Sequence, residues 1–283
     1  MQTIDLTNIK KEKIENHTSK GNQPKWHVGN KWYKADHMGY EALAEYIVSE
    51  LLKKSNVSNF VCYELITINY GNKEVNGCVS ENFKGDYEML IPLEKLHRQY
   101  FGFGLADAIA KGDVEEKIAY TVKFVEEITG LKDVGEYFSY LLAVDTFFLN
   151  EDRHTNNIAV IRNEKSKEYR FAPIFDNGLS LLSDTNDYLF ECDIYDNIKK
   201  IQAKPFSINF DGQLNAVEEM YGSHLMFNFT QKDIYEILDT VADVYDEKII
   251  KRVEKTLLEQ MRKYQYFFKN KNYKPFGSDQ LIK

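Results

Sequence analysis

The sequence predicts an α+β protein with two lobes, a small β-rich lobe that carries one main helix and a larger, mostly helical lobe. The first third of the 283 residues holds short apolar runs separated by turn signals, whereas later segments repeat apolar residues at helical spacing. Hydrophobic residues make up 43% of the chain and aromatic residues 14%, which is enough for a sizeable core. We place the small lobe at residues 1–85 and the larger lobe at residues 86–283.

The small lobe is expected to alternate strands with a single helix. Gly29-Asn30 and Gly71-Asn72 are typical hairpin turns between apolar runs. Leu43, Ile47 and Leu51 recur at helical spacing and predict the helix. In chain order we expect a polar lead-in over residues 1–17, two strands over 26–34, the helix over about 39–54, and a strand pair over 59–69 and 75–83.

The larger lobe is predicted from long segments whose apolar residues repeat every three or four positions. The last of these is the longest, with Ile250, Val253 and Leu257 on one face. A short apolar hairpin around Ile158 and Phe171 interrupts the helices. The expected helices cover residues 114–128, 134–148, 211–221, 231–244 and 247–268.

The residues around this hairpin point to phosphoryl transfer. Asp152 precedes Asn157 by five residues, and Asp176 follows the second strand, so the hairpin would return Asp176 to the side of Asn157. Phosphotransferases that hold a nucleotide through a divalent metal place an Asp base, an Asn ligand and a second Asp in this order. We expect Asp152 to accept the proton of the attacking hydroxyl. Asn157 and Asp176 would bind Mg²⁺, which prefers hard oxygen ligands.

Lys34 is the candidate for a nucleotide-phosphate contact. It stands before an acidic helix, as does a kinase lysine that reaches the α- and β-phosphates of ATP and pairs with a helix carboxylate. Glu41 and Glu45 lie one turn apart on one face of that helix, so either could be the partner. We favour Glu45, which leaves Glu41 as a cap or a solvated carboxylate.

Two further segments are candidates for nucleotide binding. The polar turn at Gly21, Asn22, Gln23, Pro24 and Lys25 is either a phosphate loop, whose N–H groups would face anionic oxygens, or an ordinary turn. The strand end at Val79–Phe83 is either a hinge that meets the adenine edge or an ordinary strand end. The hinge residues expected at the cofactor are Glu81, Asn82 and Phe83.

Three segments together resemble the HipA-like serine/threonine kinases. They are the Gly-x-Gln-Pro-Lys loop at residues 21–25, the Trp32-Tyr33-Lys34 strand with the helix that follows it, and Asn150-x-Asp152-x-His154-x-x-Asn157 with Phe175-Asp176. The resemblance spans residues 18–180 and is to the short, single-domain members. It implies a two-lobe protein-kinase-like fold that uses ATP and Mg²⁺ to phosphorylate a Ser or Thr hydroxyl of a protein.

The resemblance also implies properties beyond the reaction. A small DNA-binding antitoxin becomes a candidate partner. The position of a serine that HipA-like kinases autophosphorylate corresponds to Thr18 or Ser19, which could equally be ordinary loop residues. Many HipA-like chains carry Lys or Arg just before the metal-binding Asn, whereas this chain has Asn156 there. The contribution of a basic residue to phosphate binding at that position is therefore open.

Two other functions are compatible with the same residues. The Asp-Arg-His-x-x-Asn string also resembles phosphoinositide kinases, so a lipid or small-molecule kinase is one alternative. A nucleotide-binding toxin–antitoxin component that signals by conformation is the other. We expect His154 to hold backbone by hydrogen bonds rather than to bind zinc or act as an acid or base. Arg153 would either face phosphate or pair with an acid, and Lys199, Lys200 and Lys204 would form a solvated turn.

Composition excludes several classes of protein. A net charge of −8 and a pI near 5.4 argue against direct nucleic-acid binding. No apolar run approaches the length of a membrane span, and the polar N-terminus is unlike a signal peptide. Three cysteines without metal-ligand spacing fit a reducing environment. We therefore expect a cytoplasmic protein.

Overall fold

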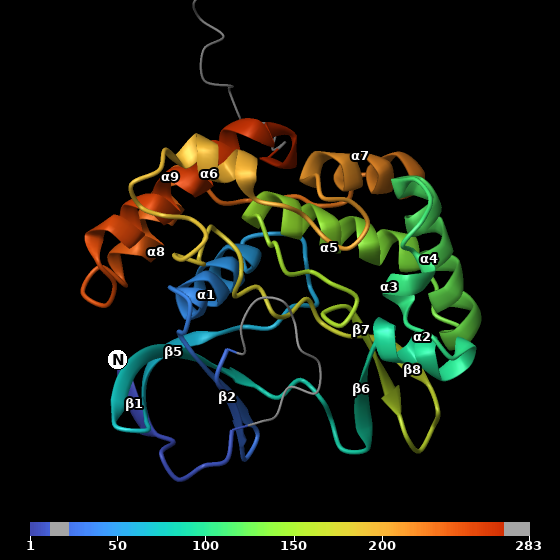
Figure 1. Ribbon diagram of the computed structural model, residues 1–283, viewed down its shortest axis with the longest axis horizontal. Coiled ribbons are helices and arrows are strands. Elements are labelled where there is room, and N and C mark those ends of the chain that lie inside the picture. The colour runs from blue at the N-terminus through green and yellow to red at the C-terminus, as the bar shows by residue number, and fades with distance from the viewer. Residues whose placement is uncertain (12–22, 269–283) are drawn as a thin grey trace, which may run out of the picture.

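A five-stranded sheet forms the N-terminal part of the protein (Figure 1), in the strand order β1-β4-β5-β3-β2. The structure is a computed structural model and describes residues 1–11 and 23–268. The β4–β5 hairpin turns at Gly71 and Asn72, both at positive φ, as the sequence predicts. The strands are β1 (Gln2–Asp5), β2 (Lys25–Val28), β3 (Lys31–Ala35), β4 (Glu64–Tyr70) and β5 (Lys73–Glu81).

The first strand corrects the prediction of a polar lead-in. Gln2–Asp5 pairs in parallel with Ile66–Asn69 of β4. The segment is polar and mostly exposed, so it shows none of the apolar alternation that marks a strand in sequence. Its place in the sheet depends on main-chain hydrogen bonds to β4, which the sequence does not reveal.

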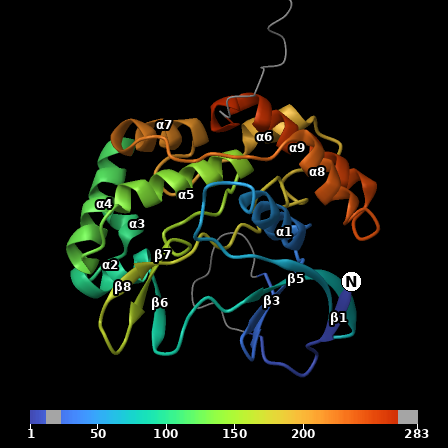
Figure 2. The ribbon, with the colours of Figure 1, turned by 180° about the vertical axis from the view of Figure 1, so that it is seen from behind.

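Helix α1 (Glu41–Leu52) is almost wholly buried. Ten of its twelve residues are buried, and Figure 2 shows the helix between the five-stranded sheet and the helices of the larger part. Leu43, Ile47 and Leu51 belong to the same hydrophobic core as Phe138 and Phe147 far along the chain. The predicted boundary at residue 85 falls between strands β5 and β6, but the core continues across it through α1.

The larger part is helical and holds a second, three-stranded sheet in the order β6-β7-β8. Its helices form an arc over both sheets (Figures 1 and 2). The strands are β6 (Glu88–Pro92), β7 (Ala159–Asn163) and β8 (Tyr169–Phe171). The helices are α2 (Leu93–Phe101), α3 (Leu105–Ala108), α4 (Val114–Thr129), α5 (Val134–Phe148), α6 (Ile194–Lys200), α7 (Phe210–Tyr221), α8 (Gln231–Asp239) and α9 (Glu247–Lys263), followed by a 3-10 turn (Gln265–Phe268).

Most predicted elements of this part are present. The hairpin β7–β8 and helices α4, α5 and α7 lie where the sequence predicts them, whereas α8 is shorter than expected and α9 ends before the 3-10 turn. The elements β6, α2, α3 and α6 were not predicted. Strand β6 is a strand because it pairs with β7, which lies much later in the sequence, so its own residues give no local signal. Among residues 1–11 and 23–268, no helix is long and apolar enough to span a membrane.

Helix α5 is the central support of the site. Twelve of its fifteen residues are buried, and it ends at Leu149 with a φ of 57°. Phe147 packs against Phe227 with ring centroids 4.6 Å apart, which fixes the last turn in an aromatic cluster. The chain therefore enters the segment that carries Asp152 from a rigid helix.

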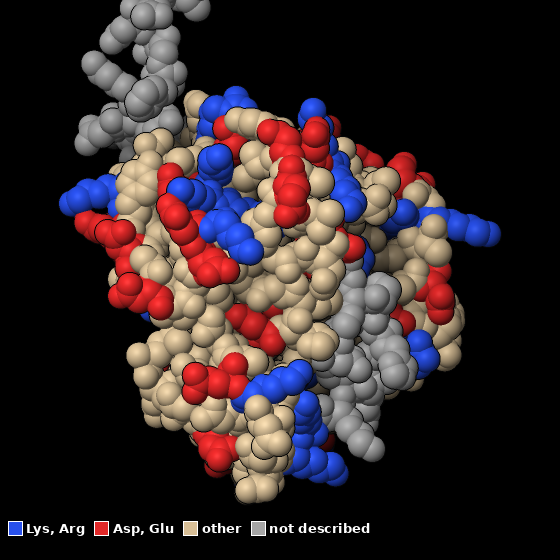
Figure 3. Space-filling model, turned by 60° about the vertical axis from the view of Figure 1, so that its left-hand side comes forward, with Lys and Arg blue, Asp and Glu red and all other residues tan. Residues whose placement is uncertain are grey.

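Figure 3 shows that acidic and basic side chains are interspersed on the face drawn there.

Asp36, between β3 and α1, gives the fold a pH dependence. Its carboxylate accepts hydrogen bonds from the Ala42 N–H at 2.6 Å and from the Tyr245 hydroxyl at 2.9 Å. Burial, reinforced by the Glu41 carboxylate, raises the pKa of Asp36 from 3.8 to about 8. Between these two values the folded state holds a proton that the unfolded state lacks, so this group's contribution to stability falls as the pH rises through that window.

We expect Asp36→Asn to stabilise the protein by removing this ionisation while keeping the shape of the side chain. The gain in melting temperature should be several degrees larger near pH 8 than near pH 5, because the destabilisation that the buried acid causes grows with pH between its unfolded and folded pKa values. Thermal unfolding at both pH values measures it, with the exposed Asp243→Asn as the control. A gain that is equal at the two pH values would contradict the assignment.

Candidate active site

Lys34 lies between two carboxylates in the interior. Its Nζ donates to Glu45 Oε1 at 2.5 Å and to Asp176 Oδ1 at 2.6 Å, and the Tyr63 hydroxyl lies 3.5 Å away. The predicted pairing of Lys34 with Glu45 is thus confirmed. Glu41 instead is buried and accepts hydrogen bonds from three backbone N–H groups that precede α1, so it holds the chain that enters the helix and is neither a helix cap nor solvated.

Electrostatics keep this cluster charged. Burial alone would raise the pKa of Asp176, but Lys34 and Lys25 outweigh it and hold that pKa well below its usual range. Burial would likewise lower the pKa of Lys34, but Asp176 and Glu45 raise it well above its usual value. Burial raises the pKa of Glu45, against the attraction of Lys34. Asp176 is therefore a carboxylate, ready to bind a cation.

Asp176 also has a strained backbone. Its φ is 60°, in the left-handed region that most residues with a side chain avoid and that Asp and Asn adopt more often than others. Such strain persists where the surroundings hold the residue in place, and it concentrates at functional sites. Glu45 is part of those surroundings, because its second oxygen accepts a hydrogen bond from the Asn177 N–H at 2.8 Å.

Arg153 is fully buried and joins the two halves of the site. Its Nε lies 2.9 Å from Asp145 Oδ2, so it pairs with an acid and does not face phosphate. Its Nη1 donates to the carbonyl oxygens of Asn157 and Phe175, at 3.0 and 2.6 Å. Its Nη2 donates to Asn177 Oδ1 at 2.8 Å. One side chain therefore holds the segment of Asp152 and Asn157 against the segment of Asp176.

Asp152 and Asn157 lie together, as the five-residue spacing predicts. The Asn157 side-chain Nδ2 donates to the carbonyl oxygen of Asp152 at 2.9 Å. The Asp152 N–H donates to Asn150 Oδ1 at 3.1 Å, so amide side chains hold the loop on both sides. The Asp152 carboxylate is left to face other side chains.

His154 corrects an expectation. Within residues 1–11 and 23–268, neither of its ring nitrogens has a hydrogen-bond partner, so the ring does not hold this part of the backbone as predicted. Instead Nε2 lies 3.6 Å from Asp152 Oδ2. Burial lowers the pKa of His154, which favours a neutral imidazole beside the carboxylate.

Lys204 is a second correction. It was expected in a solvated turn with Lys199 and Lys200, but its Nζ lies 3.2 Å from Asp152 Oδ1. Lys199 and Lys200 end helix α6 instead, and Lys200 donates to the carbonyl oxygen of Asp187. No local sequence signal could have identified the contact of Lys204, because it bridges residues 52 positions apart.

A cavity opens beside Lys34 and Asp176. Asn82 and Phe83 line it, as the hinge prediction requires, together with Trp32, Leu90 and Phe175, which sequence reasoning did not assign to the site. Trp32 could have been found, because residues two apart on a strand share a face and Lys34 is two positions further on. The apolar walls suit the adenine ring of a nucleotide, and the lysines at one end suit its phosphates.

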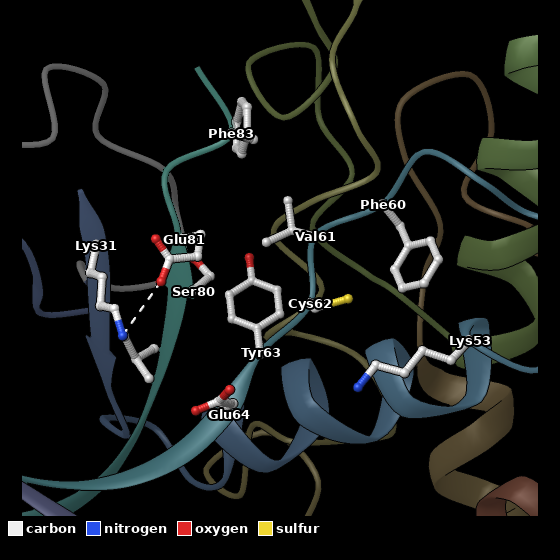
Figure 4. A pocket seen from close by; sticks show the side chains of 11 residues that line it. Lys31, Lys53, Phe60, Val61, Cys62, Tyr63, Glu64, Ser80, Glu81 and Phe83 are labelled. Atoms are coloured by element: carbon white, nitrogen blue, oxygen red, sulfur yellow. Dashed lines mark ion pairs between the residues drawn. The ribbon is translucent and has the colours of Figure 1, made fainter. Parts of the chain in front are cut away.

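Glu81 does not line this cavity. It pairs across the sheet with Lys31, its side chain is 65% exposed, and its carboxylate lies 3.4 Å from Lys31 Nζ (Figure 4). Both side chains border a second pocket, which also includes Cys62 and Lys53. That pocket is larger, at about 260 Å³ against 140 Å³, but it lacks Lys34 and Asp176. We therefore assign the chemistry to the smaller cavity. The Glu81 side chain does not line it, and the hinge prediction, which concerns backbone groups at the adenine edge, stays a prediction.

The predicted phosphate loop is only partly described. Gly21 and Asn22, with Thr18 and Ser19, lie outside the described residues. Gln23 has a buried side-chain Nε2 without a hydrogen-bond partner within the described part of the chain, and Lys25 lines the cavity. A buried donor that lacks an acceptor is the feature that an anionic ligand would satisfy.

The oxygen donors present suit Mg²⁺. Asp176 supplies a carboxylate held in its charged form, and Asn157 supplies a side-chain amide on the neighbouring segment. Residues 1–11 and 23–268 contain no group of three or more His, Cys, Asp or Glu side chains able to hold a metal. This is compatible with Mg²⁺, which keeps several waters and uses one or two carboxylates beside the phosphates of a substrate.

Comparisons with known proteins identify the fold to which this site belongs. No protein-family model matches the chain. The serine/threonine-protein kinase CtkA of Helicobacter pylori (strain J99) is 34% identical over 109 residues, which are 38% of this chain and 33% of CtkA. The matched segment thus spans about a third of that relative. In the crystal structure of an H. pylori proinflammatory kinase CtkA, the superposition covers 92% of this chain and 94% of that one, with a TM-score of 0.60 and 21% identity.

The chain has the HipA-like kinase fold. A second solved structure supports this, the HipA toxin of Shewanella oneidensis MR-1 in complex with HipB and operator DNA. It matches 89% of this chain and 66% of its own, with a TM-score of 0.50 and 14% identity. The predicted α+β architecture of this chain is thus confirmed. Its N-terminal part is built on a β-sheet and its C-terminal part is helical.

Proposed function

We propose that the protein is an ATP- and Mg²⁺-dependent kinase that phosphorylates Ser or Thr hydroxyls of a protein. The observation that carries the proposal is the Lys34–Glu45–Asp176 cluster, in which Lys34 and Glu45 are buried and which Arg153 connects to the segment of Asp152. A candidate phosphate-binding cation and a candidate metal carboxylate thus line one cavity, and Arg153 holds the segment that carries the candidate base against them. The Ser/Thr specificity is proposed from the similarity to CtkA, which is named as a serine/threonine-protein kinase.

Each residue has a defined part in the proposed reaction. Lys34 would hold the phosphates closer to the nucleoside, and Glu45 keeps Lys34 in position. Asn157 and Asp176 would hold Mg²⁺, which supplies neutralisation of phosphate charge when bound. Asp152 would accept the proton as the acceptor hydroxyl oxygen bonds to the terminal phosphorus and the bond from that phosphorus to the bridging oxygen breaks.

The direct test uses labelled nucleotide. The protein is incubated with ATP labelled at the γ-phosphate and Mg²⁺, alone and with a cell lysate, and labelled proteins are identified by mass spectrometry. We expect label on Ser or Thr residues, including the chain itself if it autophosphorylates. Label on lipid or on a small molecule would replace this proposal by the alternative reaction in the same cavity.

Nucleotide binding alone gives a second test. Mg²⁺ and ATP should raise the melting temperature, because a ligand of the folded state adds about 2.7 kcal/mol at a hundredfold excess over Kd. Lys34→Ala should reduce this rise. The rise is measured against the same variant without nucleotide, because the substitution also destabilises the protein by leaving Glu45 buried without its partner. Lys31→Ala, on the exposed rim, is the matched control. If millimolar purine nucleotides produce no shift, the protein is not a kinase.

A partner and a compartment belong to the same proposal. The structurally similar HipA is in complex with HipB and DNA, which supports a small protein of the antitoxin class as a partner of this chain. Cys62, Cys78 and Cys192 are free thiols, which supports the reducing cytoplasm as its place. Co-purification with the product of an adjacent small gene would test the partner, and separate elution of the two would contradict it.

A further inference from the structure

Lys204 is placed to act at the transferred group. Its Nζ lies 3.2 Å from Asp152 Oδ1, in a side chain that is 36% exposed, whereas the Asp152 side chain is 14% exposed. The ammonium group thus contacts the proposed base and still faces solvent, where an incoming phosphate would arrive. An exposed lysine that paired only for stability would contribute little, because surface ion pairs are worth about 0–1 kcal/mol.

The backbone around Lys204 is anchored on both sides. Ala203 and Phe206 are buried, and the Ala203 N–H donates to the carbonyl oxygen of Ile208 at 3.0 Å. The Phe206 ring packs edge-on against Phe138 of helix α5, with centroids 5.8 Å apart. The position of Lys204 over Asp152 is therefore set by the core, and not by a freely moving turn.

Two other cations near the site are engaged with buried acids, and Lys25 and Lys84 line the cavity beside Lys34 and Asp176. Arg153 is fully buried against Asp145, and Lys34 is held between Glu45 and Asp176. Asn156, just before the metal-binding Asn, is uncharged. Among the lysines and arginines of the described residues, it is Lys204 that contacts the Asp152 carboxylate.

We propose that Lys204 is a catalytic residue that binds the γ-phosphoryl group during its transfer and supplies the cation that Asn156 does not. The proposal rests on the kinase function above. In the free protein Lys204 Nζ bonds to Asp152 Oδ1. In the reaction it contacts the oxygens of the transferred phosphoryl group, where negative charge is spread, while Asp152 takes the hydroxyl proton. The lysine keeps its own proton throughout, so the atoms balance without it.

The test separates the γ-phosphate from the rest of the nucleotide. Dissociation constants for Mg²⁺–ATP and Mg²⁺–ADP are measured by calorimetry for wild type, Lys204→Met, Lys204→Arg and the control Lys199→Met. We expect Lys204→Met to weaken ATP by about tenfold or more and ADP by less than about twofold, because only ATP carries the group that Lys204 contacts. Lys204→Arg should restore most of the ATP affinity, and Lys199→Met should bind both nucleotides as wild type does.

Transfer rates give the second measurement. Lys204→Met should lower kcat by about a hundredfold, since loss of one donor to transition-state charge has an effect of this size. Equal weakening of ATP and ADP, or an unchanged ATP affinity together with an unchanged kcat, would overturn the role of Lys204 alone. If wild type binds ATP but transfers nothing to the acceptors tried, the ATP and ADP affinities of Lys204→Met still decide whether Lys204 contacts the γ-phosphate. If wild type binds no ATP, the kinase proposal falls, and this inference with it.

Discussion

Asp152→Asn is expected to lower phosphate transfer by about 10²–10⁴-fold while nucleotide affinity stays close to that of wild type. The substitution keeps the size of the side chain and removes the proton acceptor. Folding should be little affected, because the Asp152 backbone N–H and carbonyl groups hold the loop, and its carboxylate adds only an ion pair with the partly exposed Lys204, which is worth about 0–1 kcal/mol. Single-turnover transfer and calorimetric ATP binding, measured on the same preparation, separate the two effects.

Two comparisons sharpen this experiment. Asp176→Ala should instead weaken Mg²⁺-dependent nucleotide binding, since it removes the metal carboxylate and leaves Lys34 with one partner fewer. Asp196→Asn, an exposed acid in α6, should change neither quantity. Turnover by Asp152→Asn at a near-normal rate on every acceptor would show that the base is another group. His154, 3.6 Å from the same carboxylate, would then be the first residue to examine.

Arg153→Met should be the most destabilising single change in the site, by about 3–5 kcal/mol. It leaves Asp145 buried without its partner, and it removes the donors to the carbonyl groups of Asn157 and Phe175. Denaturant unfolding measures the effect. We expect a lower midpoint, and any folded fraction should bind nucleotide weakly because the segments of Asp152 and Asp176 are no longer joined.

The double variant Arg153→Met with Asp145→Leu identifies the cause. Removing both charges relieves the unpaired carboxylate, so the double variant should be more stable than Arg153→Met alone. It should not recover fully, because the two backbone carbonyl groups still lack their donor. An Arg153→Met protein with the midpoint of wild type would contradict the structural role of this side chain.

Local sequence patterns predicted the parts of the protein whose signal lies within a few residues. The period of Leu43, Ile47 and Leu51 predicted α1, and the position of Lys34 before an acidic helix predicted its pair with Glu45. The hairpin β7–β8 followed from two apolar runs and a turn. In each case, the neighbours in sequence are also the neighbours that determine the structure.

Contacts between distant segments were not predictable in this way. Strand β1 is polar, and only its ladder with β4 makes it a strand. Lys204 reaches Asp152 through a loop whose position depends on Phe206 packing against α5. The side chain of Glu81 pairs across the sheet with Lys31 and does not line the cavity, a pairing that the sequence of one strand does not reveal.

The burial of α1 limits how this site could be controlled. Leu43, Ile47 and Leu51 share a core with the helices of the larger part, and Glu45 also bonds to the backbone of Asn177. Swinging α1 outward would expose those three side chains at about 1.5–3 kcal/mol each, which is comparable to the whole stability of many domains. An inactive state made by rotating this helix is therefore too costly. We therefore expect regulation of this protein to act on what enters the cavity and to leave the ion pair of Lys34 with Glu45 assembled.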